Sequence, residues 1–169
     1  STTVLGQEFP VPIALTPLGI QSLLHEGAEG ATAAATADVG VPMVLSSLSS
    51  TPMEAVADAL GSTPRWFQFY WSSDERIARS FLTRAENAGY DAIVVTVDAP
   101  ILGWRERLIE RGYYPFLEGD GVANYFSDPA FRDRLDAPPE EDTEAAVEEF
   151  LDIFGDAVTF QERVVAPLD

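Results

Sequence analysis

The chain has 169 residues, 46% of them hydrophobic and 11% aromatic, and its formal net charge is −18 at pH 7. Such a chain is long and apolar enough to fold as a domain with a buried core, which excludes a disordered protein. With no cysteine, one histidine and ten bases that are all arginine, disulfides and metal sites rich in cysteine or histidine are excluded, and binding to nucleic acids or anionic membranes is disfavoured.

The acidic surplus leaves two explanations open. A surface adapted to high salt, where screening removes the self-repulsion of the charges, is the one we favour. An acidic docking face for a basic partner is the alternative. No apolar run approaches the ~18 residues of a membrane span, and residues 1–10 lack the basic start of a secretory signal. We therefore expect a cytoplasmic protein of a halophilic organism.

Short apolar runs alternate with segments of helical character through the first hundred residues. In chain order, the predicted strands are 11–16, 41–47, 65–71 and 91–100, and the predicted helices between them are 25–40, 51–61 and 73–90. The first helix is rich in alanine and ends in glycine. Thr51 is the expected N-cap of the second helix, with Glu54 at the capping-box position, and Ser73 is the expected cap of the third.

This alternation predicts an α/β fold with a parallel sheet. Both a doubly wound open sheet and a (β/α)8 TIM-barrel type of fold would accept it. The first strand is not followed by a GxGxxG motif, which disfavours the dinucleotide-binding form of the open sheet. A complete barrel needs eight βα units and ~250 residues, and this chain has about the first four units.

The pattern stops after Pro100. Residues 1–105 contain 11 acids and 5 arginines, whereas residues 106–169 contain 17 acids and 5 arginines. We therefore place a boundary near 106–116, between the four βα units (1–105) and an acidic second segment (106–169).

Within the second segment, the sequence predicts an irregular stretch at 114–135, with turns at Gly119–Gly121 and Asp128–Pro129. An amphipathic helix is predicted at 138–155, with Ala146, Phe150, Ile153 and Phe154 on one face. Residues 157–169 remain unassigned.

In parallel βα folds, functional side chains collect at the carboxyl ends of the strands. Those ends carry Thr16, Pro17, Leu18, Gly19, Ser46, Ser47, Gln68, Tyr70, Thr96 and Asp98, with Arg105 beyond. The set suits a hydrogen-bonding cradle for a polar planar ring beside an anion. Each residue also has an ordinary structural reading, as a cap, turn, core or surface ion-pair residue, although a buried amide such as that of Gln68 must find partners.

Several segments of the sequence together resemble a known family. The segments "PIALTPLGIQSLLHEGAEGATAAATADVG", "RWFQFYWSSD", "RAENAGYDAIVVTVDAP" and "LGWRER" together resemble the FMN-dependent 2-hydroxy acid oxidases. The following "YFSDPAFRDRL" and "PPEEDTEAAVEEFLDIFGD" are most similar to the lactate 2-monooxygenase branch, which has a long insertion after the fourth strand. The resemblance thus implies that residues 1–105 are the first half of a barrel and that residues 106–169 are an acidic insertion. The resemblance runs from about residue 2 to residue 156.

The resemblance implies a (β/α)8 barrel with FMN at its C-terminal face. The backbone of Thr16, Pro17 and Leu18 would then lie along the flavin, with Gly19 leaving room beside the ring. Ser46, Gln68 and Thr96 would hydrogen-bond the ring. Tyr70 and Arg105 would contact the substrate, and Asp98 would orient the catalytic histidine. The implied reaction is the oxidation of a small L-2-hydroxy acid by oxygen, with lactate as the first candidate substrate.

The chain also departs from this family. It has no lysine and no "SNHGGRQ"-like run, so the base histidine, a second arginine and the phosphate loop of the second barrel half are missing, and His25 matches a structural histidine instead. We therefore expect part of a longer or partnered enzyme that is inactive as this chain alone. The alternatives are a non-catalytic half-barrel, which self-associates as a homo-oligomer or docks on a complementary half, and a bare FMN binder.

Overall fold

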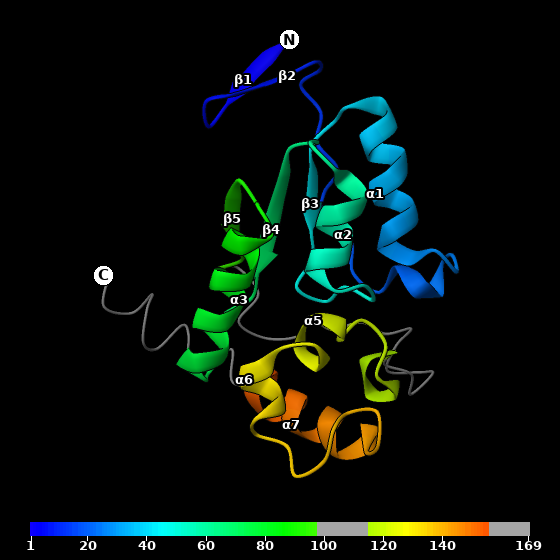
Figure 1. The fold of residues 1–169 in the computed structure, drawn as a ribbon, viewed down its shortest axis with the longest axis vertical. Coiled ribbons are helices and arrows are strands. Elements are labelled where there is room, and N and C mark those ends of the chain that lie inside the picture. Colours follow the sequence, from blue (N-terminus) through cyan, green and yellow to red (C-terminus); the bar gives the residue numbers. More distant parts are fainter. Residues whose placement is uncertain (98–114, 156–169) are drawn as a thin grey trace.

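The computed structural model describes residues 1–97 and 115–155. Its centre is a parallel sheet of β3 (Met43–Leu45), β4 (Arg65–Phe69) and β5 (Ala92–Val95), in that spatial order (Figure 1). Leu45 pairs with Phe67, and Phe69 with Val95, so the carboxyl ends of all three strands lie at one edge of the sheet. The predicted parallel arrangement is confirmed for these strands, and the strand predicted at 91–100 is described as far as residue 97.

The strand predicted at 11–16 is replaced by a single bridge. Leu15 N donates to Pro42 O over 2.9 Å, and Val44 N donates to Leu15 O over 3.0 Å, which makes a parallel bridge beside β3. Proline has no N–H to donate to a ladder, and Pro12 interrupts this run. The start of the chain therefore follows the edge of the sheet without adding a regular strand to it.

A hairpin that the sequence did not predict precedes this bridge. It joins β1 (Thr2–Val4) to β2 (Gln7–Phe9) in antiparallel pairing. Its two turn residues, Leu5 and Gly6, both have positive φ, at 51° and 80°. Leucine is rare in such a turn, where Asn-Gly is the usual signal, so the sequence carried no recognisable hairpin motif.

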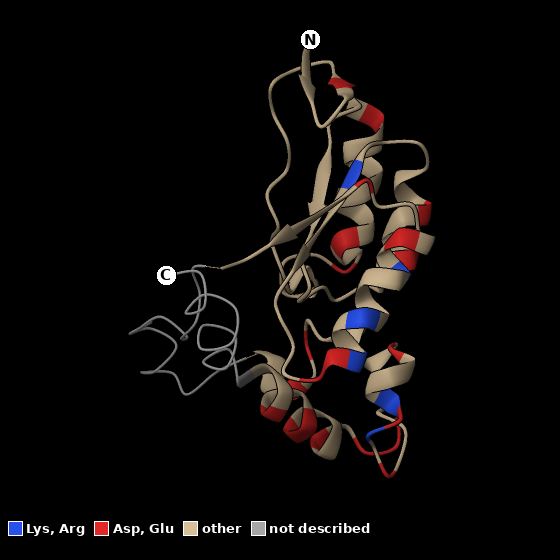
Figure 2. Ribbon diagram, turned by 90° about the vertical axis from the view of Figure 1, so that its left-hand side faces the viewer, with Lys and Arg blue, Asp and Glu red and all other residues tan. Residues whose placement is uncertain are grey.

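Three helices lie on one side of the sheet, as the side view shows (Figure 2). They are α1 (Ala28–Val39), α2 (Met53–Leu60) and α3 (Glu75–Asn87), with α2 packed against both neighbours. All three were predicted, but two caps were wrong. Pro52 occupies the N-cap of α2 and makes no side-chain cap bond, and Asp74, not Ser73, caps α3 by accepting a hydrogen bond from Arg76 N at 2.8 Å.

The described part of the predicted insertion, residues 115–155, stands at the carboxyl ends of the strands (Figure 1) and is called the insertion below. It contains η2 (Pro115–Glu118), α5 (Ala123–Phe126), α6 (Pro129–Arg132) and α7 (Thr143–Gly155). The stretch predicted as irregular is thus made of three short helices, separated by turns at which Gly119 and Gly121 have positive φ. The apolar face predicted for α7 is confirmed, because Ala146, Phe150 and Ile153 are buried.

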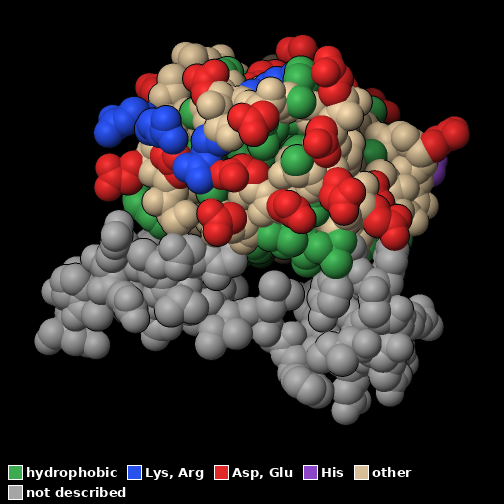
Figure 3. Space-filling model, turned by 90° about the horizontal axis from the view of Figure 1, so that it is seen from below, with side chains coloured by type: hydrophobic (Ala, Val, Ile, Leu, Met, Phe, Trp, Pro, Cys, Tyr) green, Lys and Arg blue, Asp and Glu red, His purple; other side chains and the backbone are tan. Residues whose placement is uncertain are grey.

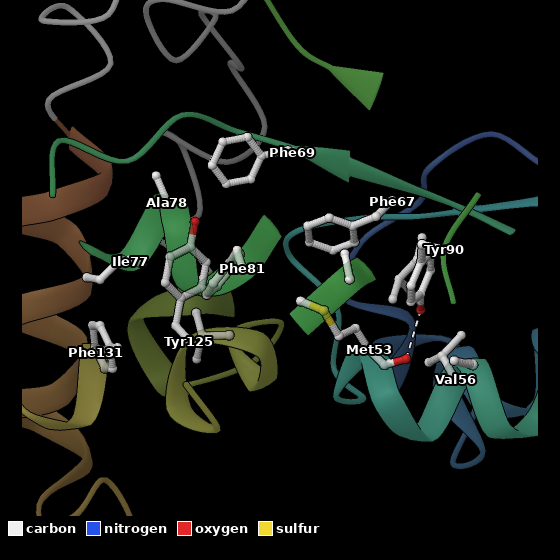
Figure 4. Packing of buried hydrophobic residues seen from close by; sticks show 14 of the residues in the cluster. Met53, Val56, Phe67, Phe69, Ile77, Ala78, Phe81, Tyr90, Tyr125 and Phe131 are labelled. Carbon is white, nitrogen blue, oxygen red and sulfur yellow. Dashed lines mark hydrogen bonds between the residues drawn. The ribbon is translucent and has the colours of Figure 1, made fainter. Parts of the chain in front are cut away.

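One hydrophobic core joins the sheet, its helices and the insertion (Figure 4). The ring centroid of Tyr125, on α5, lies 4.8 Å from that of Phe81 on α3 and 4.8 Å from that of Phe150 on α7. Phe67 and Phe69 of β4 pack on the other side of Phe81. The insertion is therefore built into the core. The boundary predicted near 106–116 falls mostly outside the described residues.

Within the described ranges, 1–97 and 115–155, no helix has both the length and the apolar character needed to cross a membrane.

Candidate functional site

Three predicted site residues meet at the carboxyl edge of the sheet. Ser46 follows β3, Gln68 lies within β4, and Thr96 follows β5. Gln68 Nε2 donates to Thr96 Oγ1 over 2.8 Å, and Ser46 Oγ donates to Gln68 Oε1 over 3.4 Å. Ser46 and Gln68 are buried, and Thr96 is half-buried. The structure thus links one hydroxyl, one amide and a second hydroxyl in a chain across three neighbouring strands.

Ser47 fixes the orientation of this amide. Its N–H donates to Gln68 Oε1 over 3.2 Å, and its hydroxyl donates to the Gln68 carbonyl over 2.7 Å. The same hydroxyl accepts from Tyr70 N at 3.1 Å. Because Gln68 Oε1 accepts from a backbone N–H, its Nε2 must face Thr96, which determines which end of the amide is the donor.

The predicted loop of residues 16–19 lies beside Ser46. Thr16 and Leu18 are exposed, whereas Pro17 and Gly19 are half-buried. A Cβ atom on Gly19 would lie 2.6 Å from the carbonyl oxygen of Leu48 and 3.3 Å from Ser46 Oγ. The close approach of this loop to the segment after β3 therefore gives a steric reason for glycine that differs from the one inferred from the sequence.

Tyr70 lies at the end of β4 and faces the insertion. It is half-buried, and its ring centroid is 5.5 Å from that of Phe154 on α7, in an edge-to-face arrangement at 83°. This contact brings the substrate-binding candidate against the insertion. Asp98 and Arg105, the other two catalytic candidates, lie outside the described residues.

A buried carboxylate that the sequence analysis overlooked supports the first loop. Glu29 on α1 is 0% exposed, and its Oε1 accepts from Gln21 N and Ser50 N, both at 3.1 Å. Gln21 Nε2 in turn donates to Leu18 O over 3.0 Å. Glu29 thus ties the loop before α1 to the loop after β3. An acid within an alanine-rich helix was the only signal available in the sequence.

The single histidine has a local role. His25 is exposed, and its Nδ1 accepts a hydrogen bond from Gly27 N at 2.9 Å, just before α1. This agrees with the structural role that the sequence suggested for it.

Tyr125, on α5 of the insertion, is buried near Tyr70. Burial raises the pKa of Tyr125 well above its ordinary value, and the neighbouring Tyr70 and Asp128 raise it further. The Tyr125 hydroxyl therefore stays protonated at any physiological pH.

The arrangement fits one part of a flavin. The edge of an isoalloxazine ring offers alternating nitrogen and carbonyl groups, and the Ser46, Gln68 and Thr96 side chains present hydroxyl and amide groups in a row along the edge of the sheet. The phosphate group of FMN is not matched in the same way. Within residues 1–97 and 115–155, no arginine lies at these strand ends, and the sequence contains no lysine.

Sequence comparison gives a family match over almost the whole chain. The sequence model of the family described as FMN-dependent dehydrogenase matches residues 1–164. An FMN-dependent alpha-hydroxy acid dehydrogenase of Schizosaccharomyces pombe is 45% identical over 137 residues, which cover 78% of this chain and 33% of that protein. An L-lactate oxidase of Lysinibacillus sphaericus is 40% identical over 131 residues, which cover 78% of this chain and 34% of that protein.

Structure comparison agrees. A mandelate oxidase variant with a C4a-OH-FMN adduct matches with a TM-score of 0.68 and 35% identity over 81% of this chain and 43% of that one. The chain therefore adopts part of the TIM-barrel fold of the hydroxy acid oxidases, as predicted. It spans about a third of the length of the curated relatives that it matches.

Proposed function

This chain belongs to the FMN-dependent dehydrogenase family, and we propose that it forms part of an enzyme that oxidises a small L-2-hydroxy acid with FMN. The observation that carries the proposal is the hydrogen-bonded chain from Ser46 through Gln68 to Thr96. A buried amide tied to two hydroxyls at one sheet edge is more than a strand needs in order to pack, and it suits the polar edge of a flavin. The named relatives, which include L-lactate oxidases, support the same choice of substrate class.

The residues of this chain divide into two groups. Ser46, Gln68 and Thr96 bind the flavin ring, and the Thr16–Pro17–Leu18 backbone and Gly19 lie along it. When bound, FMN would supply the two-electron redox chemistry between the hydroxy acid and oxygen. Tyr70 and Arg105 bind the acid, Arg105 by the planar fork that matches a carboxylate, and Asp98 orients the base.

We infer that the base is supplied from outside residues 1–169, by a longer polypeptide or by a partner. His25 is occupied in a turn ahead of α1, and the sequence contains no other histidine. We therefore infer that residues 1–169 alone have negligible turnover and that the remaining wall of the site, including the phosphate-binding groups, lies in the two thirds of the relatives' length that this chain does not span.

Anaerobic reduction tests the proposal. The full native polypeptide is purified, and its visible flavin band is followed as L-lactate or D-lactate is added without oxygen. We expect L-lactate alone to bleach the band. Product analysis of turnover in air, with catalase present to remove free peroxide, then separates an oxidase, which releases pyruvate and hydrogen peroxide, from a lactate 2-monooxygenase, which releases acetate, carbon dioxide and water. A preparation without flavin, or a band that L-lactate leaves unchanged, would refute the assignment.

A second candidate rests on the exposure of β5. Val95 of β5 is 45% exposed, and Val97, two residues beyond the strand, is 60% exposed, although both are apolar. An open apolar edge of this kind needs a covering partner. The alternative function is therefore a non-catalytic half-barrel that pairs with a complementary half or a second copy. Size-exclusion chromatography of residues 1–169 in molar salt tests it, because a clean monomer would count against it.

A further inference from the structure

Asn124, in the insertion, is completely buried at the carboxyl edge of the sheet. It lies on α5 and is 0% exposed. Its Nδ2 donates to Ser46 O over 3.3 Å and to Ser47 O over 3.2 Å. Its Oδ1 accepts from Met53 N at 2.8 Å, at the first turn of α2. One side chain therefore forms hydrogen bonds both to the segment that follows β3 and to the start of α2. Both partners lie more than seventy residues before Asn124 in the sequence.

Only an amide of this length satisfies all three bonds. The carbonyls of Ser46 and Ser47, just after β3, need donors, whereas the N–H of Met53 at the start of α2 needs an acceptor, and an amide carries both on one planar group. An aspartate would keep the acceptor for Met53 N, but it would bring negative oxygens against the carbonyls of Ser46 and Ser47. An alanine would leave all three buried backbone groups without a partner.

α5 is held in place independently of β3. Arg84 Nη1 donates to the backbone carbonyl of Asn124 over 2.7 Å and to Asp128 Oδ2 over 3.1 Å. Ala123 N also donates to Ser49 O over 3.0 Å. Asn124 thus has a fixed backbone from which its side chain can hold the strand end.

The peptides that Asn124 holds are those that orient Gln68. The segment Ser46–Ser47 accepts from Asn124 on its carbonyl side, and Ser47 donates to Gln68 from its N–H and its hydroxyl. Gln68 then reaches Thr96. A displacement of Ser47 would therefore rotate or shift the amide at the centre of the candidate cofactor site.

From this geometry we propose that Asn124 is a positioning residue for the flavin site. It fixes the end of β3, and through Ser47 it sets the orientation of the Gln68 amide toward the cofactor. The inference rests on the proposed function, and it gives the insertion a role in binding the ring edge.

The test compares Asn124→Asp and Asn124→Ala with the matched control Asn87→Asp in the full native polypeptide. Asn87 is exposed at the end of α3, so the control makes the same chemical change away from the site. FMN affinity is measured by fluorescence titration of the apoprotein, and the visible spectrum of bound FMN reports the polarity at the ring. We expect both Asn124 variants to weaken FMN binding about tenfold or more and to shift the visible band, and the control to change neither.

The variant Phe131→Leu distinguishes a positioning role of Asn124 from a purely structural one. Phe131 is buried in the same insertion, where it stacks on Phe126 and meets the edge of Tyr125. This variant is expected to lower the unfolding midpoint while it leaves the FMN affinity and spectrum of the folded protein unchanged. If Phe131→Leu alters FMN affinity as much as Asn124→Asp does at equal loss of stability, the positioning role is refuted.

If the Asn124 variants do not fold, Ser47→Ala tests the same inference. It removes the hydroxyl that donates to the Gln68 carbonyl and accepts from Tyr70 N, at little steric cost, and is expected to shift the flavin band in the same direction. An unchanged spectrum and affinity in Ser47→Ala, or in a folded Asn124→Asp, would overturn the inference while the proposed function stood. A wild-type polypeptide that binds no FMN would instead remove the proposed function itself.

Discussion

Gln68 is the central residue of the hydrogen-bonded chain at the edge of the sheet. It is 2% exposed, and its amide is bonded on both sides, to Ser47 N and to Thr96 Oγ1. The sequence allowed the convergence of Ser46, Gln68 and Thr96 to be predicted, because parallel strands in register bring their carboxyl ends to one edge. It gave no sign of Asn124, since a contact across more than seventy residues leaves no local pattern.

At the same scale, Asp74 makes stability depend on pH. Its pKa is lowered well below its ordinary value, first by the hydrogen bond from the Arg76 side chain, against an opposing effect of burial, and further by Arg76 N and Arg134. A depressed carboxyl pKa contributes stability above the unfolded pKa of ~3.9 and loses it as the pH falls toward the folded value.

We therefore predict that Asp74→Asn lowers the free energy of unfolding at pH 7 by about 1 kcal/mol, because asparagine still caps α3 but cannot form the ion pairs. In urea unfolding, the difference between the two proteins should stay constant above about pH 5 and narrow below pH ~3.9. If the difference in the free energy of unfolding is unchanged below pH ~3.9, the charge on Asp74 is not the cause of the stabilisation.

At the level of elements, glycines and prolines allowed most boundaries to be predicted, and tertiary contacts decided the caps. Gly40 and Gly61 follow α1 and α2 as expected. The start of α2, however, is closed by Asn124 from the insertion, and so Thr51 is not needed as a cap. Glu54, which the sequence suggested for a capping box, instead pairs with Arg84, with Nε and Oε1 2.7 Å apart. The short helices η2, α5 and α6 were missed because about one turn is too short for a periodic pattern.

The insertion depends on α7 for its packing. Phe150 is 0% exposed, and its ring lies within contact of Tyr125 and Phe154. We predict that Phe150→Ala lowers the free energy of unfolding by about 3–5 kcal/mol, because it opens a cavity between α5 and α7.

Its matched control is Glu148→Ala, on the exposed side of α7. This change should alter the free energy of unfolding by less than about 0.5 kcal/mol. Thermal unfolding followed by circular dichroism measures both variants, and equal effects of the two would contradict the packing assigned to α7.

At the scale of the whole molecule, acidic side chains dominate the surface. Figure 3 shows acids spread over the face of the insertion, with few arginines among them. Several arginines of the described chain are already paired with acids, among them Arg132 with Glu140 at 2.9 Å and Arg134 with Glu149. The acids still outnumber the arginines, 28 to 10, and the unpaired carboxylates therefore repel one another.

Salt should relieve this repulsion. We predict that the unfolding midpoint rises between about 0.1 M and about 1 M potassium chloride, as the Debye length falls from ~10 Å to ~3 Å. The rise should shrink in acid, where the carboxylates are protonated. A midpoint that does not respond to salt at neutral pH would favour the other explanation, an acidic docking face.

The central claim is that the polar ends of β3, β4 and β5 hold the edge of a flavin. Its most direct test is the dissociation constant of FMN for the full native polypeptide with Gln68→Leu, compared with wild type and with Gln7→Leu on the N-terminal hairpin as the control. Loss of the amide leaves Ser47 N and the flavin edge without a partner, so we predict a rise of about tenfold to a hundredfold for Gln68→Leu. A folded Gln68→Leu protein that binds FMN as tightly as the wild type would contradict the claim.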